Sequence, residues 1–312
     1  MNIQQLEYII ALDNYRQYVV AAERSFVTQA TLSIMVKKLE EELGVKIFDR
    51  SKQPLVPTDT GKKIIAQARI VVQEFYKVAE VASQDINHLS GVLSLGIIPT
   101  LSPYLLPLFI DYFLKNYPAV KLKISELTTA TIIRKLENGE LDAGLLAIPT
   151  LHPSMKEIPL FREEFVVYAP AIEATSPKKF VVASEIDVNR LMLLEEGHCL
   201  TNQVINLCGL KELEKDHHQL DFHTGSLETL KQMVEIYKGI TVLPRLAVDV
   251  LSTLQKESVF EFQPPAPYRD IGIVTYRHFV KENLLRALQI AILQGIPECI
   301  ECFQDVELPS GS

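Results

Sequence analysis

Cys199 and Cys208 lie nine positions apart, and His198 directly precedes the first of them. If the segment between them were one helix, a rise of ~1.5 Å per residue would hold the two Cα atoms ~13 Å apart. A disulfide requires Cα atoms roughly 4.4–6.8 Å apart, so this pair can be joined only in an irregular loop or after local refolding. A pair that bonds by refolding is a redox switch. The alternative is two unrelated cysteines buried as small apolar residues.

Reaction of a cysteine with a peroxide requires the thiolate, and an unperturbed cysteine is mostly protonated near neutral pH. A histidine or another cation beside the sulfur favours the thiolate. The position of His198 next to Cys199 therefore makes Cys199 the candidate reactive thiol.

The remaining cysteines and histidines predict no metal or cofactor site. Cys299 and Cys302 form a lone CxxC, without the second pair that a four-ligand zinc site needs. His217, His218 and His223 lie among acidic and polar residues that are typical of a solvated loop. The chain also has no glycine-rich phosphate loop and no GxSxG motif, so we do not expect an enzyme.

The composition of the 312 residues, 47 % hydrophobic and 22 % charged, is typical of a globular chain with two or three domains. No basic region followed by an apolar block marks a secretory signal. The stretch between Asp85 and Asp111 has no charged residue, but its glycines and prolines disfavour a membrane helix. We expect a cytoplasmic protein with no membrane partner, where disulfides are rare and usually redox-sensing or catalytic.

The net charge of −8 is unevenly distributed. Residues 1–65 hold nine Lys or Arg and eight Asp or Glu, which leaves 22 and 31 for the rest of the chain. DNA would repel the acidic remainder but not the N-terminal piece.

The first sixty residues predict three short helices and a hairpin. Apolar residues recur at helical spacing between Ile3 and Ile10, a second helix is expected at about 17–23, and Thr28 is suited to cap a third helix that runs to Leu43. Two short helices joined by a tight turn form a helix-turn-helix.

The start of the third helix and the basic hairpin that follows it (residues 46–61, the wing) are the expected DNA-contacting surfaces. Gln can pair with adenine, while Ser, Lys and Arg can hold phosphates or reach the minor groove. The alternative is a three-helix domain with a solvated hairpin. The expected DNA-contacting residues are Thr28, Gln29, Thr31, Ser33, Lys37, Arg50, Lys52 and Thr58.

The runs VTQATLS (residues 27–33) and LGVKIFDR (residues 43–50) resemble the winged helix-turn-helix of the LysR-type transcriptional regulators. The chain departs from the family at Ala30, where proline is usual, and at residues 34–36, which are more apolar than the usual Arg or Gln. The resemblance implies double-stranded promoter DNA with two-fold sites and RNA polymerase as partners.

Residues 59–88 predict one long helix whose apolar residues repeat with a period of 3.5. A small winged domain has nothing to bury so long a seam, so we expect a partner helix in a homodimer or homotetramer. The alternative is packing onto the chain's own body. The residues of this predicted dimerisation seam are Ile64, Ala68, Val71, Phe75 and Val78.

Residues 89–302 predict strand–helix–strand units of a parallel α/β sheet, and the pattern repeats after residue 160. Sites in such sheets lie beyond the carboxyl ends of the strands, where Thr100 and Thr129 enter helices. The alternative for both threonines is an ordinary helix cap.

This pattern resembles the periplasmic-binding-protein-like (type 2) effector domain of LysR regulators. The resemblance implies a first lobe at 89–161 and about 270–302, and a second lobe at 162–269. It places the winged helix-turn-helix at 1–58 and leaves a tail, 303–312, that we expect to be disordered. In many relatives the cleft between the lobes binds a metabolite.

The run LLEEGHC (residues 193–199) with Cys208, together with IIPT (residues 97–100), resembles the peroxide-sensing branch of this family. The resemblance implies that hydrogen peroxide oxidises Cys199 to a sulfenic acid and that Cys208 resolves it to a disulfide. A thioredoxin- or glutaredoxin-type dithiol would reverse the reaction. The residues that the resemblance places around the peroxide and the thiolate are Thr100, Thr129, His198 and Arg269.

Two other functions remain open at this point. One is a LysR-type regulator that binds a small metabolite between its lobes, with both cysteines as bystanders. The other is a thiol peroxidase whose winged domain is only a tether.

Overall fold

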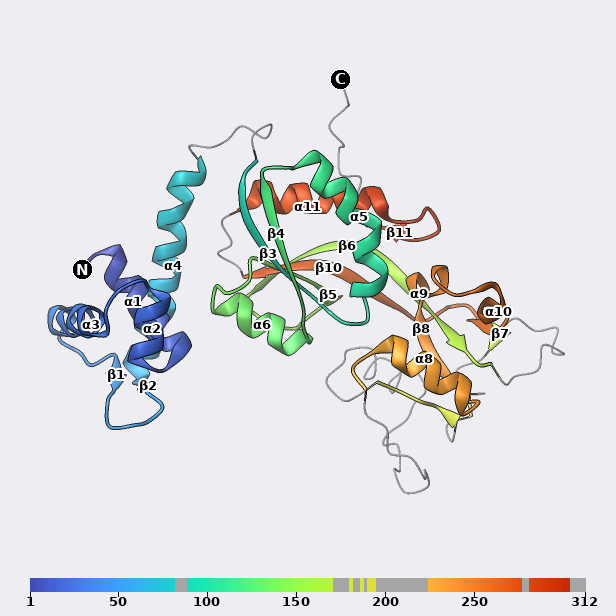
Figure 1. Cartoon of the computed structure of the whole chain (residues 1–312), viewed down its shortest axis with the longest axis horizontal. Coiled ribbons are helices and arrows are strands. Elements are labelled where there is room, and N and C mark those ends of the chain that lie inside the picture. The colour runs from blue at the N-terminus through green and yellow to red at the C-terminus, as the bar shows by residue number, and fades with distance from the viewer. Residues whose placement is uncertain are drawn as a thin grey trace. The chain divides into compact units, whose positions relative to one another are not determined.

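The computed structural model divides near residue 88 into two compact units, whose elements are labelled in Figure 1. The predicted redox residues Cys199, Cys208 and His198 lie outside the described residues, and so does the predicted tail from residue 304 on. The described residues are 1–81, 89–170, 180–181, 186–187, 190–194, 224–276 and 281–303.

The first unit contains the three helices and the hairpin that the sequence predicts. Thr28 caps the third helix by accepting a hydrogen bond from the Thr31 backbone N–H at 3.2 Å. Gly44 ends that helix with φ +70°, a conformation that only glycine adopts at little cost. The elements of this unit are α1 (Ile3–Tyr15), α2 (Tyr18–Arg24), α3 (Gln29–Leu43), β1 (Phe48–Asp49), β2 (Val56–Pro57) and α4 (Asp59–Val81).

The start of α4 packs against the winged domain itself. A Cβ atom on Gly61 would lie 2.0 Å from the Ile47 carbonyl oxygen, so only glycine allows this close approach. Ile65 and Ala68 are buried in the core of the unit, and Ile64 is partly buried against it. The prediction that the winged domain leaves the whole seam unburied is therefore wrong for Ile64 and Ala68, because both pack with the apolar core of this unit. Val71, Phe75 and Val78 are exposed.

The second unit begins with three parallel strands. β3 (Gly91–Ile97) lies between β4 (Val120–Glu126) and β5 (Ala143–Ile148). Strand β4 alternates apolar and polar residues and is the edge of the sheet, whereas β5 is almost wholly buried. The connecting helices are α5 (Ser102–Asn116) and α6 (Thr129–Glu137).

Two long strands make the sheet mixed rather than purely parallel, which corrects the prediction. β10 (Tyr268–Tyr276) pairs antiparallel with both β5 and β6 (Met155–Tyr168). The last residues of β6 pair instead with β8 (Thr241–Pro244) and β9 (Val259–Phe262). The sheet is mixed because β6 leaves the first group of strands and β10 returns to it, so the two run in opposite directions (Figure 1).

Short strands that pair with β6 and β9, together with further helices, complete the described part of the second unit. A single parallel bridge joins Leu191 to Ile240. The remaining elements are β7 (Phe180–Val181), α8 (Leu227–Ile236), α9 (Arg245–Asp249), α10 (Thr253–Lys256), α11 (Glu282–Gly295) and β11 (Glu301–Cys302).

Candidate functional site

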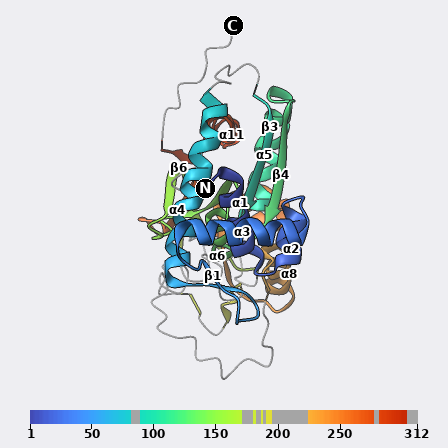
Figure 2. The same ribbon diagram turned by 90° about the vertical axis from the view of Figure 1, so that its left-hand side faces the viewer.

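The outer face of α3 is the surface that a helix-turn-helix places in the major groove of DNA. Leu32, Val36 and Leu39 point into the core of the first unit, which turns the opposite face of the helix outward. Figure 2 shows α3 lying across the front of the other helices of this unit. The predicted contact residues Gln29 and Lys37 are exposed on this outer face.

The two predicted threonines at the start of α3 are bound to each other. The Thr28 hydroxyl lies 2.8 Å from the Thr31 hydroxyl and also caps the helix. Ser33 is half-buried, and exposed Lys37 lies 3.6 Å from Glu41 one turn later. An exposed pair of this kind is worth little, so Lys37 can exchange it for a phosphate.

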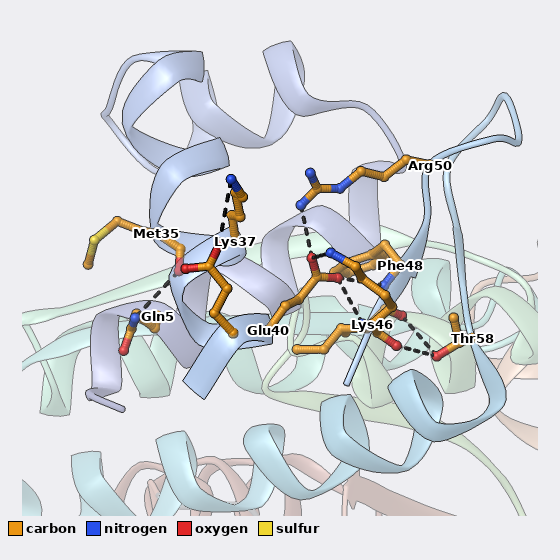
Figure 3. Close-up of polar contacts among 10 residues, drawn as sticks. Gln5, Met35, Lys37, Glu40, Lys46, Phe48, Arg50 and Thr58 are labelled. Carbon is orange, nitrogen blue, oxygen red and sulfur yellow. Dashed lines mark hydrogen bonds and ion pairs between the residues drawn. The ribbon is translucent and has the colours of Figure 1, made fainter. Parts of the chain in front are cut away.

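Glu40 is a buried carboxylate that ties α3 to the wing (Figure 3). One carboxylate oxygen accepts hydrogen bonds from the backbone N–H groups of Ile47 at 2.8 Å and Phe48 at 3.2 Å. The other accepts from Arg50 Nη2 at 2.9 Å and lies 3.7 Å from Lys46 Nζ. The predicted DNA contact Arg50 is therefore oriented by Glu40, with part of its side chain still exposed.

Thr58 has a structural role at the other end of the wing. Its hydroxyl donates to the Lys46 carbonyl at 2.7 Å (Figure 3). It also accepts from the Gly61 backbone N–H at 2.9 Å. These bonds occupy the hydroxyl that was predicted to contact DNA, so that contact stays a prediction. Lys52 is exposed between the two strands of the wing.

The role of Glu40 was not predicted, although the spacing of residues in α3 indicates that its side chain is buried. Glu40 follows Val36 by four residues and Leu32 by eight, so it falls on the buried stripe of α3. A carboxylate in an apolar stripe needs partners, and here the wing supplies them.

In the second unit, the structure brings Arg269 and Thr100 together, two of the residues predicted to surround the peroxide and the thiolate. Arg269 is fully buried on β10 and donates from Nη1 to the Thr100 hydroxyl at 2.9 Å and from Nη2 to the Thr100 carbonyl at 3.3 Å. These two residues lie 169 positions apart in the sequence.

Glu163 on β6 forms an ion pair with Arg269. One Glu163 oxygen accepts from Arg269 Nε at 2.8 Å, and the other accepts from the Leu246 backbone N–H at 2.9 Å. Both side chains of the pair are buried completely. The cluster therefore joins β6, β10, the turn after β3 and the start of α9.

The role of Glu163 was also not predicted, although the alternation of side chains along β6 places it on a buried face. Phe161, Glu163 and Phe165 are all buried and share one face of the strand. A carboxylate between two buried aromatic residues predicts a buried cationic partner.

Thr129 lies at the same edge of the sheet as Thr100. Strands β3 and β4 are parallel neighbours with Ile97 opposite Glu126, and each threonine follows its strand end by three residues. Thr129 is half-buried and is the first residue of α6, whereas Thr128 is the cap position. This edge therefore gathers the two predicted hydroxyls.

A second polar cluster joins α5 to α8. The Tyr104 hydroxyl donates to Glu228 at 2.6 Å, and the buried Lys231 ammonium donates to the same carboxylate at 2.9 Å. Burial and the bond to Glu228 raise the pKa of Tyr104. Burial alone would raise the pKa of Glu228, but the hydrogen bonds from Lys231 and Tyr104 hold that pKa below its ordinary value.

The CxxC motif lies on β11 and just before it. Cys299 and Cys302 are exposed and are not joined to each other. Burial of part of its side chain raises the pKa of the Cys302 thiol, which disfavours the thiolate. Across the part of the chain that the structure describes, no cluster of His, Cys, Asp and Glu is placed to hold a metal ion. None of the helices described is long and apolar enough to cross a membrane.

Two protein families match the chain. Residues 3–62 match the family described as "Bacterial regulatory helix-turn-helix protein, lysR family". Residues 87–295 match the family described as "LysR substrate binding domain". The outer face of α3 and the Arg269–Glu163 cluster lie within these two ranges.

Individual relatives are similar along most of the chain. The "Hydrogen peroxide-inducible genes activator" of Dickeya chrysanthemi is 35 % identical over 274 residues, covering 88 % of this chain and 89 % of the relative. The "DNA-binding transcriptional dual regulator OxyR" of Escherichia coli K12 has the same identity and coverage. The solved structure of full-length Pseudomonas aeruginosa OxyR, with a cysteine-to-aspartate substitution, has a TM-score of 0.77, 34 % identity and coverage of 95 % of this chain and 99 % of that one. These matches confirm the predicted architecture of a helix-turn-helix followed by a two-lobed α/β regulatory domain.

Proposed function

The chain belongs to the LysR family of bacterial transcription regulators, and from this premise we propose that it regulates promoters in response to hydrogen peroxide. A family of regulators leaves no place for the thiol peroxidase alternative. Relatives named for hydrogen peroxide match 88 % of the chain, and this observation carries the proposal. The contact between Arg269 and Thr100 supports it further, because it joins two residues predicted for the peroxide site.

The proposed signal is the oxidation of Cys199. The Cys199 thiolate attacks one oxygen of hydrogen peroxide, the O–O bond breaks, and the sulfenic acid and hydroxide form. The hydroxide takes up the proton that the thiol released and leaves as water. The Cys208 thiol then attacks the sulfenic sulfur and releases a second water as the disulfide forms. Thr100, Thr129 and His198 would hold the peroxide, and Arg269 would favour the thiolate.

The proposed response is a changed arrangement of the winged domains on DNA in the cytoplasm. A disulfide between Cys199 and Cys208 would shorten the segment that joins them and change how it packs. In a homo-oligomer this change would move the paired winged domains. Their new arrangement would alter the contacts with two-fold promoter sites and with RNA polymerase. The exposed Val71, Phe75 and Val78 on α4 would form the contact between copies. A thioredoxin- or glutaredoxin-type dithiol would restore the reduced state.

Two cysteine variants test this chemistry. We expect Cys208→Ser to accumulate a sulfenic acid that a dimedone-type reagent traps after one equivalent of peroxide, because the resolving thiol is missing. We expect Cys199→Ser to trap none and to leave DNA binding insensitive to peroxide. A Cys199→Ser protein that still responds would contradict the proposal. Stabilisation of that protein by a small organic acid would then favour a metabolite-binding regulator.

A further inference from the structure

Two large apolar side chains are exposed on the helix-turn-helix. The Phe26 side chain is 96 % exposed in the turn before α3, and Ile34 is 66 % exposed on α3 itself. Ala30 lies between them in sequence, is also exposed, and shares a helix face with Ile34 because the two are four residues apart. We name Phe26, Ala30 and Ile34 the apolar strip.

The backbone holds Phe26 outward. Its φ is +54°, a left-handed conformation that is costly for a bulky residue, and its N–H donates to the Glu23 carbonyl at 3.2 Å. No part of the described first unit covers the ring. The turn therefore exposes an aromatic side chain that makes no packing contribution to the described first unit.

The charges around the apolar strip favour DNA as its occupant. No Asp or Glu lies between Gln29 and Lys38, and the helix N-terminus adds partial positive charge at the start of this stretch. Lys37 and Lys38 follow on exposed positions, and Arg50 and Lys52 lie on the wing. An uncharged apolar surface bordered by cations suits a groove lined by phosphates.

The chemistry of the major groove identifies what apolar side chains can read there. The C5-methyl group of thymine is the apolar feature of base edges in this groove, and Ala and Phe are among the side chains that contact it. We propose that the apolar strip reads thymine C5-methyl groups and thereby sets part of the operator preference. This inference rests on the proposed binding of promoter DNA.

Deoxyuridine lacks only the C5-methyl group of thymidine, so it isolates the proposed contact. The full-length protein would first select its preferred duplexes from a random library. The selected duplex would then be resynthesised with deoxyuridine at one thymidine position at a time. We expect the affinity of the unaltered protein to fall about fourfold at each contacted position, which corresponds to ~0.8 kcal/mol for one buried methylene.

Two variants locate the contact. Phe26→Asn keeps a residue that tolerates positive φ, and Ile34→Gln keeps a helix-forming residue of similar length. Each variant should bind the thymidine and deoxyuridine duplexes equally well when the exchanged position is the one that the replaced residue contacts. Leu151→Asn is a matched control for Phe26→Asn, because Leu151 also has positive φ and an exposed side chain but lies in the second unit. It should keep the full sensitivity to deoxyuridine.

Each contrary outcome is distinct. Selection of no duplex would overturn both the binding of promoter DNA and this inference. Equal binding of thymidine and deoxyuridine duplexes by the unaltered protein would overturn this inference alone. Retained sensitivity of both variants to deoxyuridine would also overturn this inference. If the variants in addition had a lower oligomeric mass, the apolar strip would be a contact between copies.

Discussion

At the scale of single residues, two buried carboxylates organise the parts of this chain that matter for function. Glu40 holds the start of the wing against α3, and Glu163 holds Arg269 beside Thr100. Neither was predicted, although each lies within an otherwise buried pattern of its helix or strand. Their partners are backbone N–H groups or side chains distant in sequence. Local pattern could therefore show that a carboxylate falls among buried residues, but not which groups pair with it.

Glu40→Ala should destabilise the first unit. It leaves the backbone N–H groups of Ile47 and Phe48 without an acceptor, and unsatisfied buried donors of this kind cost about 2–4 kcal/mol together. Glu40→Gln retains an oxygen acceptor and should cost about 1 kcal/mol. Urea unfolding followed by circular dichroism measures both. Glu41→Ala, on the exposed side of α3, is the control, and a Glu40→Ala protein as stable as this control would refute the role of Glu40.

At the scale of elements, local pattern predicted the helices and hairpin of the first unit and the alternating strands and helices with which the second unit begins. The cap at Thr28, the stop at Gly44 and the start of α4 at Asp59 follow from side-chain chemistry within a few residues. The antiparallel direction of β10 could not be predicted in this way, because it depends on a return from strands more than a hundred residues away. The burial of Ala68 was missed because it also depends on residues outside its own helix, in the core that α1, α2 and α3 form.

The contact between α5 and α8 gives a pH-dependent prediction. The folded pKa of Glu228 lies below its ordinary value, so its stabilising contribution is present above the unfolded pKa of about 4.3 and is lost as pH falls through the folded pKa. Tyr104→Phe removes one of the hydrogen bonds to this carboxylate and should cost about 1 kcal/mol at pH 7. The cost should shrink as pH falls below about 4.

Urea unfolding of both proteins at several pH values measures this difference. Tyr112→Phe, which alters an exposed tyrosine of the same helix, should change stability little at any pH. A cost of Tyr104→Phe that stays constant from neutral to acidic pH would show that the Glu228 carboxylate is not its origin.

At the scale of the whole molecule, the proposed switch requires a homo-oligomer that links oxidation of Cys199 to the binding of DNA. The exposed residues on α4 are the part of the predicted seam that remains available to another copy. Val78, a residue that is 73 % exposed, should tolerate Val78→Asp within the monomer, but the charge would oppose burial between two copies. Light scattering should therefore report a lower mass for Val78→Asp and an unchanged mass for Lys62→Asp, which alters an exposed residue in the first turn of α4. An unchanged mass for both variants would place the contact elsewhere.

The redox switch itself is tested most directly by mapping disulfides and DNA contacts on the same samples. The protein would be treated with about one equivalent of hydrogen peroxide, digested without reductant, and footprinted in parallel on promoter DNA. We expect a Cys199–Cys208 disulfide that appears together with a changed footprint, and a dithiol should reverse both. Free thiols with an unmoved footprint would contradict the switch and return the regulatory domain to the binding of a metabolite.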